Sequence, residues 1–88
     1  MKERQITVVN TLGIHARPAS LIVQTAIKFK SKILLIKDGA SADAKSIMSV
    51  MMLAAAYNST VTVRASGDDE EDAIKAIAAL FENKFNEE

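Results

Sequence analysis

The sequence is short of several residue types, and each shortage narrows what the chain can be. Its 88 residues include no cysteine, which excludes a disulfide framework and a thiolate metal site. The 11 basic side chains are balanced by 11 acidic ones, so the strongly basic composition typical of nucleic-acid-binding domains is absent. No apolar run approaches the roughly 20 residues needed to cross a bilayer. The charged residues 1–5 show no secretory signal either.

These limits leave a small chain of ordinary composition. Apolar residues make up 49% and charged residues 25% of the sequence, as in a typical globular protein. The length fits one domain spanning residues 1–88 and leaves no room for a second. We expect a cytoplasmic protein that neither enters a membrane nor binds nucleic acid.

Strand and helix patterns alternate along the whole chain. The predicted strands cover residues 6–9, 32–37, 40–43 and 60–65, and an Asp38-Gly39 hairpin turn joins the second and third. Helices are predicted over residues 16–29 and 47–53 and after the acidic run 68–72, which suits the positive end of a helix dipole. The buried stripe of the last helix is Ile74, Ile77, Ala78, Phe81 and Phe85. The order βαββαβα favours an α+β sandwich with one sheet face covered by helices.

The only histidine, His15, stands between the first strand and the first helix. Amide groups at a helix start lack backbone acceptors and form an anion site, here expected from Ala16 and Arg17. The Arg17 guanidinium adds a charge and a planar fork that suit phosphate oxygens. Pro18 is tolerated in a first turn and stiffens it, and Gly13 permits a sharp turn before the histidine. His15 could therefore take up a phosphoryl group on a ring nitrogen.

The alternative is that His15 only caps the helix, which a lone histidine would favour on composition alone. A metal site is not expected, because the chain has no second histidine and no cysteine. No other cofactor is predicted. Ser20 carries no sign of activation as a nucleophile.

A second segment, residues 45–53, is apolar almost all round. Ser46 offers an N-cap hydroxyl for a short helix. Ile47, Val50, Met51 and Ala54 follow helical spacing, so some of this apolar surface is expected to be core. A short helix cannot easily bury every side. Met48 is therefore either exposed for docking, together with Met51 or Met52, or these side chains are packed more tightly inside. The sequence leaves both interpretations open.

These two segments resemble the signatures of HPr, the histidine-containing phosphocarrier family of the bacterial sugar phosphotransferase system. Residues 13–19, Gly-Ile-His-Ala-Arg-Pro-Ala, are similar to its active-site motif, and residues 45–48, Lys-Ser-Ile-Met, to its regulatory serine motif. The likeness extends over nearly the whole chain. It implies an open-faced β-sandwich, in which a four-stranded antiparallel sheet carries three helices on one face.

The resemblance also implies a relay rather than an enzyme. His15 would accept phosphate from phospho-Enzyme I, assisted by Arg17, and pass it to sugar-specific IIA components. Ser46 would be the target of an ATP-dependent HPr kinase/phosphorylase, as in the Gram-positive type. The serine-phosphorylated form would bind a catabolite repression transcription regulator. Partners would dock on residues that match the family's surface around the active site: Leu21, Gln24, Ile47, Met48 and Met51.

Three positions depart from the family pattern. Asp43 stands where asparagine is frequent, Ser49 where glycine is usual, and residues 57–59 replace a glycine-rich turn. The first two lie nearest Ser46 and bear on recognition by the kinase. A phosphate on Ser46 would add about −1.5 to −2 charges at a helix start, so we expect interference with docking rather than refolding. The alternatives are a regulatory protein acting only through Ser46, which His15 disfavours, a nitrogen-branch carrier, and a plain α+β interaction module.

Overall fold

The computed structural model describes residues 1–86 and places four strands in one antiparallel sheet. The strands are β1 (Lys2–Thr7), β2 (Lys32–Lys37), β3 (Ala40–Asp43) and β4 (Thr60–Ser66), in the spatial order β1-β4-β2-β3. The helices are α1 (Ala16–Ala26), α2 (Ile47–Met52) and α3 (Glu70–Glu82), followed by a short 3₁₀ turn η1 (Lys84–Asn86). The βαββαβα order and the open-faced sandwich predicted from the sequence are therefore confirmed.

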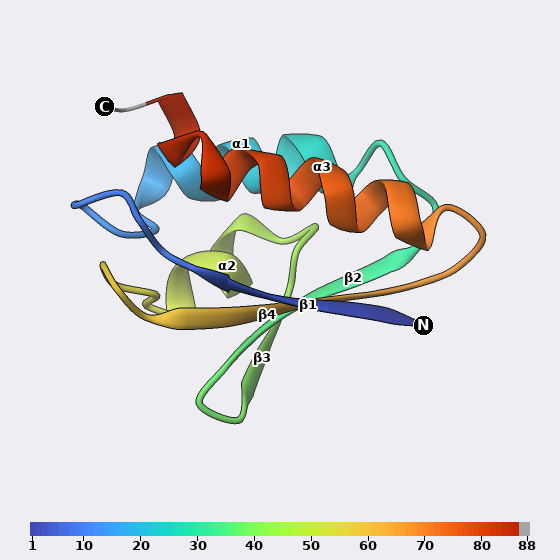
Figure 1. Cartoon of the computed structure of the whole chain (residues 1–88), viewed down its shortest axis with the longest axis horizontal. Coiled ribbons are helices and arrows are strands. Elements are labelled where there is room, and N and C mark those ends of the chain that lie inside the picture. Colours follow the sequence, from blue (N-terminus) through green and yellow to red (C-terminus); the bar gives the residue numbers. More distant parts are fainter. Residues whose placement is uncertain (87–88) are drawn as a thin grey trace.

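The helices lie on one face of the sheet, and α1 and α3 run across it side by side (Figure 1). The strands carry buried residues at alternate positions that face these helices, for example Val61, Val63 and Ala65 in β4. The core between the layers includes Ile22 of α1, and Phe81 of α3 is 1% exposed. Within residues 1–86 no helix is long and apolar enough to span a membrane.

The second and third strands have the predicted bounds, and the Asp38-Gly39 turn has the backbone that a two-residue hairpin requires. Both residues have positive φ, 51° at Asp38 and 82° at Gly39. Because β2 and β3 pair directly through this turn, Lys37 lies opposite Ala40. The local sequence was sufficient to specify this hairpin.

The first strand was predicted too late in the chain: it covers residues 2–7 and not 6–9. It lies at the edge of the sheet, where solvent suits the charged residues 2–4 and hydrophobicity is a poor guide. Val8 has left the strand, although its backbone still bonds to Ser59 and Asn58 (N···O 2.9 and 2.8 Å).

The first and last helices are shorter than their apolar stripes suggested. Helix α1 ends at Ala26 and not Phe29, because Lys28 and Phe29 make tighter bonds to carbonyls three residues back. Helix α3 ends at Glu82, and Phe85 is buried from a separate left-handed turn with φ 53°. The apolar spacing continued past both ends because the backbone continues to turn there, through hydrogen bonds three residues back after α1 and through a left-handed turn after α3.

Helix α3 begins at Glu70, two residues after the start of the acidic run, and Asp69 before it has an unexpected role. Its carboxylate accepts hydrogen bonds from the backbone N–H groups of Lys30 and Ser31, both at 2.9 Å, and from the Ser31 hydroxyl. These bonds hold the pKa of Asp69 below its ordinary 3.8, with the Ser31 hydroxyl as the largest cause. Asp69 therefore fastens the start of α3 to the loop before β2.

Candidate functional site

His15 occupies the N-cap position of α1, where the chain changes from extended to helical. Its φ and ψ are −90° and −167°, and its carbonyl accepts the N–H of Ala19 at 3.0 Å. The side chain is half-exposed and makes no capping hydrogen bond to the helix. The imidazole is thus placed at the helix start without serving the helix as a cap, which argues against the purely structural interpretation.

The loop before His15 is fastened at both sides. Gly13 N–H donates to the Asn10 carbonyl at 3.1 Å, while the buried Asn10 side-chain amide donates back to the Gly13 carbonyl at 2.6 Å. Ile14 N–H donates to the Ala55 carbonyl, beyond α2, at 2.9 Å. Gly13 has φ +69°, and a Cβ there would lie 2.8 Å from that same carbonyl oxygen. The loop that presents His15 is therefore rigid and requires glycine.

The first turn of α1 is formed as predicted. The amides of Ala16 and Arg17 precede the first intrahelical bond, from Ala19 to His15, so helix geometry gives them no acceptor in the helix. Pro18 is buried and has no N–H to satisfy. Dipole and amides together make this helix start suitable for an anion beside the imidazole.

The guanidinium of Arg17 is bonded to the C-terminal segment. Its Nη1 donates to the Phe85 carbonyl at 2.8 Å, across 68 positions of sequence. The left-handed turn exposes that carbonyl while the buried Phe85 ring packs edge-on against Phe81, with ring centroids 5.0 Å apart. The sequence contained no signal for this contact, or for those of Asn10 and Ala55, because each depends on segments that meet only after folding.

Ser46 is the N-cap of α2, as predicted, and its hydroxyl accepts the N–H of Ser49 at 3.3 Å. The preceding turn is closed by Ser46 N–H to the Asp43 carbonyl at 3.0 Å and by Lys45 N–H to the Asp43 carboxylate at 2.9 Å. The Asp43 carboxylate accepts this bond with one oxygen, and an asparagine side chain has an equivalent acceptor oxygen. The departure from the family pattern at Asp43 therefore leaves the turn intact.

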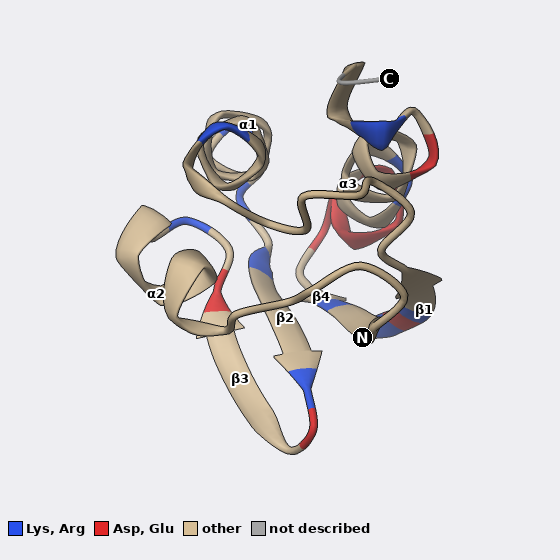
Figure 2. Ribbon diagram, turned by 90° about the vertical axis from the view of Figure 1, so that its left-hand side faces the viewer, with Lys and Arg blue, Asp and Glu red and all other residues tan. Residues whose placement is uncertain are grey.

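His15 and Ser46 lie at opposite ends of the α1–α2 pair. The start of α1 is bonded to the chain after α2, through Ile14 and Ala55. The end of α1 is bonded to the chain before α2, because Lys45 Nζ donates to the Phe29 carbonyl at 2.7 Å. The two helices lie side by side (Figure 2), and eleven residues of α1 span roughly 16 Å.

Between these ends, α2 exposes most of its apolar side chains. Met48 is 70% and Met52 77% exposed, and Ile47 and Met51 are exposed as well. Of the residues at helical spacing only Val50 is in the core, while Ile47, Met51 and Ala54 are exposed. The prediction that part of this apolar surface is core is thus confirmed at one residue, because the helix lies at the periphery and turns one narrow side inward.

The docking residues predicted on α1 have mixed environments. Gln24 is exposed, and its amide donates to the Ser20 hydroxyl at 3.0 Å. Leu21 is half-buried and packs against the core, so only part of it is available to a partner. Both residues lie on α1, which packs beside α2. We call Ile47, Met48, Met51 and Met52 the α2 apolar surface.

Comparison with known proteins places this geometry in a family. A family model described as "PTS HPr component phosphorylation site" matches residues 2–83. The "Phosphocarrier protein HPr" of Xylella fastidiosa is 48% identical over 88 residues, covering 100% of this chain and 99% of the relative. The "HPr-like protein Crh" of Halalkalibacterium halodurans is 44% identical over 84 residues, covering 96% and 100%.

A solved structure agrees closely. The crystal structure of an HPr from Thermoanaerobacter tengcongensis superposes with a TM-score of 0.96 at 52% identity, covering 100% of this chain and 99% of that one. Fold and helix-start histidine together define a phosphocarrier protein, which is not an enzyme. The chain belongs to the HPr family of the phosphotransferase system.

Proposed function

We propose that His15 accepts a phosphoryl group from phospho-Enzyme I and passes it to sugar-specific IIA components. The observation that carries the proposal is the half-exposed imidazole at the start of α1, which does not cap the helix. A carrier must meet a donor and an acceptor in turn. A half-exposed side chain can be reached by both partners in turn.

In the proposed transfer, a ring nitrogen of His15 attacks phosphorus while the bond from phosphorus to the donor breaks. In the second transfer a nucleophile of the acceptor attacks the same phosphorus, the bond from phosphorus to the ring nitrogen breaks, and the unmodified imidazole is restored. Such reactions depend mainly on positioning and charge stabilisation. The rigid loop around Gly13 positions the imidazole, and the amides of Ala16 and Arg17 stabilise the charge of the phosphoryl group.

Arg17 is proposed to stabilise the phosphoryl group with its guanidinium, which lies in the first turn of α1. Its bond to the Phe85 carbonyl would be exchanged for one to phosphate oxygens. A hydrogen bond to a charged group contributes about 1.5–3 kcal/mol. We therefore expect Arg17→Ala to slow phosphotransfer by about 10- to 100-fold, and Arg17→Lys to recover part of the rate because it restores charge but not the planar fork.

Incubation with phosphoenolpyruvate and a bacterial Enzyme I tests the carrier proposal directly. Mass spectrometry should find one acid-labile phosphoryl group on the protein and none on a His15→Ala variant. Lys28→Ala, an exposed change just beyond the end of α1 and outside the predicted docking residues, serves as a control and should still be labelled. Absence of label on the parent chain, or label that persists without His15, would refute the assignment.

We also propose that Ser46 is the phosphorylation site of an ATP-dependent HPr kinase/phosphorylase and that the modified form binds a catabolite repression regulator. The hydroxyl is half-exposed at the start of α2. Because α1 spans about 16 Å and charges are screened beyond about 8 Å in physiological salt, phosphoserine would act on docking partners rather than on His15 itself. Partners covering the α2 apolar surface would meet the new charge at its edge.

Ser46 can be tested with ATP and such a kinase, which should add one acid-stable phosphate to the chain and none to Ser46→Ala. A Ser41→Ala variant, which changes an exposed serine on β3, is the matched control and should still be modified. Asp43→Asn should be modified at least as fast as the parent chain, because it removes a negative charge that would repel the incoming phosphate from the turn before Ser46. Normal modification of Ser46→Ala would move the site elsewhere.

The alternative functions remain a Crh-like regulator, a nitrogen-branch carrier and a plain interaction module. Similarity to an "HPr-like protein Crh" is the observation that favours the first. A regulator acting only through serine has no need of a phosphorylatable histidine. Labelling of Ser46 but not His15 in the two assays would select it over the sugar-branch carrier.

A further inference from the structure

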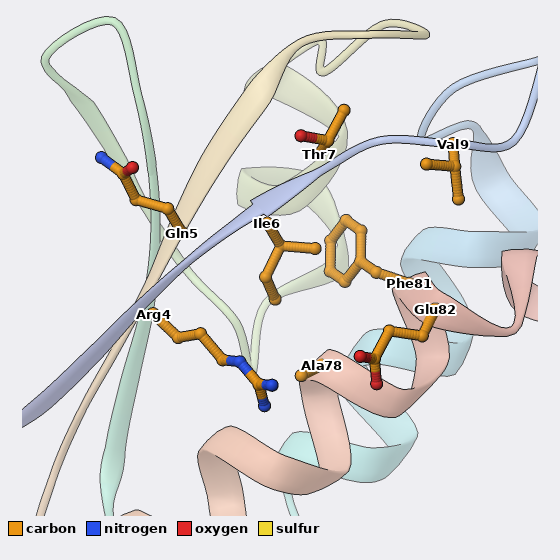
Figure 3. Close-up of a pocket in the computed structure, with 8 residues that line it drawn as sticks. All are labelled: Arg4, Gln5, Ile6, Thr7, Val9, Ala78, Phe81 and Glu82. Atoms are coloured by element: carbon orange, nitrogen blue, oxygen red, sulfur yellow. The ribbon is translucent and has the colours of Figure 1, made fainter.

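The edge strand β1 and helix α3 enclose a groove on the side of the molecule away from α2. β1 pairs only with β4 among the described strands, so its other edge offers backbone N–H and C=O groups. Two open hollows follow this edge, one of about 370 Å³ and one of about 320 Å³, and they meet at Arg4. In the first, the side chains of β1 and α3 face each other (Figure 3).

The side chains of β1 that face α3 form a short pattern of two cations and one apolar residue. The register with β4 places Arg4 opposite Val63 and Ile6 opposite Val61, both buried beneath the helices. Lys2 shares this face because side chains alternate along a strand. The floor beyond Ile6 continues into Ala78 and Phe81 of α3.

The acidic residues near this face do not neutralise Arg4. Glu3 belongs to the opposite face of the sheet, where its carboxylate is paired with Arg64. Glu82 points towards the same space as Arg4 (Figure 3), yet within residues 1–86 the Arg4 guanidinium forms no hydrogen bond or ion pair. The other hollow is lined by one cation and one anion of α3, Lys75 and Glu71.

We propose that this β1–α3 groove binds an extended acidic peptide of another protein, which adds to the sheet as a fifth strand. Main-chain bonds to β1 would give affinity, and the groove would select side chains. Opposite residues of paired strands share a face. An antiparallel peptide would therefore present an apolar residue over Ile6, then an acidic residue opposite Arg4, then an acidic residue opposite Lys2, each separated by one position.

The same pattern disfavours a second copy of this chain as the occupant. Antiparallel pairing of two β1 strands sets Arg4 opposite Arg4, Lys2 or Ile6 of the other copy and never opposite an acidic residue, because opposite residues must share a face. Like charges directly opposite each other destabilise a pair of strands. The charges that protect this edge from self-association are those that an acidic partner would satisfy.

The test uses the full ¹⁵N-labelled chain and a synthetic heptapeptide with valine, glutamate and aspartate at alternate positions. Saturable amide shifts are expected in residues 2–7 and in α3, while α1 and α2 remain unchanged. A peptide with lysine at both acidic positions should not bind. Arg4→Glu should weaken binding of the acidic peptide by about tenfold or more and allow the lysine peptide to bind.

Lys28→Glu, an equally exposed charge reversal near the end of α1, is the matched control and should bind the acidic peptide like the parent chain. Preserved amide spectra will establish that each variant is folded. The proposal is overturned if the acidic peptide does not bind the parent chain below millimolar concentration, if the shifts fall on α1 and α2, or if Arg4→Glu and Lys28→Glu behave alike. Phosphorylation of His15 should be unaffected by the peptide.

Discussion

Replacing Gly13 by alanine should destabilise the protein far more than the same change at Gly39. Both glycines have positive φ, +69° and +82°, so alanine at either site meets the left-handed backbone cost of about 1–2 kcal/mol. That cost is offset by the reduced freedom of the unfolded chain, about 0.4–1 kcal/mol. At Gly39 nothing lies within 4 Å of the added Cβ, so we expect a net loss of about 1 kcal/mol.

At Gly13 the added methyl also meets backbone that cannot move aside. It would lie 2.8 Å from the Ala55 oxygen and 3.1 Å from the Ala56 Cα. The Ala55 oxygen already accepts the Ile14 N–H, so relief of the clash breaks that bond. Overpacking of this kind costs about 1–3 kcal/mol. The total is about 2–4 kcal/mol, or roughly 10–25 °C in melting temperature for a domain of this size.

Thermal and urea unfolding of the two variants will measure the difference. A further readout is the rate of phosphorylation by Enzyme I, which should fall for Gly13→Ala even under conditions where it is folded, because the displaced loop carries His15. Gly39→Ala should retain the parental rate. Equal losses of stability in the two variants would show that the approach of Gly13 to Ala55 carries no energy, and the account of the loop would be wrong.

Three further predictions follow from single contacts. Met48→Glu should weaken docking of Enzyme I in a titration without lowering the melting temperature, whereas Ile27→Glu, 60% exposed but outside the α2 apolar surface, should leave docking unchanged. Asp69→Asn should lower stability at neutral pH: the carboxyl pKa is depressed in the folded state, so its contribution is present above pH 3.8 and lost as pH falls below it. The two urea unfolding curves should therefore converge in acid, and a constant gap would contradict this. Phe85→Ala should cost about 3–5 kcal/mol and release the carbonyl that holds Arg17, which calorimetry and the Arg17 side-chain NMR signal can follow.

The sequence predicted the fold where local preferences and burial agree. The β2–β3 hairpin follows from Asp38-Gly39, and the start of α2 follows from Ser46, each within a few residues of chain. The bounds of β1 and α1 were predicted wrongly, because they were placed from the hydrophobic pattern of a whole segment. The edge strand was misplaced because solvent contact removes its hydrophobic signature, and α1 was extended to Phe29 because tighter turns keep a similar period.

The candidate site also has a part that the sequence predicted and a part that only the folded structure showed. The order of residues around His15 was enough to predict a helix start with an open anion site, because first-turn amides and a tolerated proline are properties of neighbouring residues. Only the folded chain placed the Phe85 carbonyl on Arg17 and the Ala55 carbonyl behind Gly13. Such contacts depend on packing between distant segments, and no local pattern encodes them.

The sequence by itself determined that a histidine and a serine stand at helix starts, because capping and the helix dipole are local effects. The tertiary structure decided how they are related. It set His15 and Ser46 at opposite ends of an antiparallel helix pair and left the α2 apolar surface exposed between them. The reason is geometric: a six-residue helix at the edge of a small core can turn only one narrow side inward, and which side it turns depends on the layers beneath it.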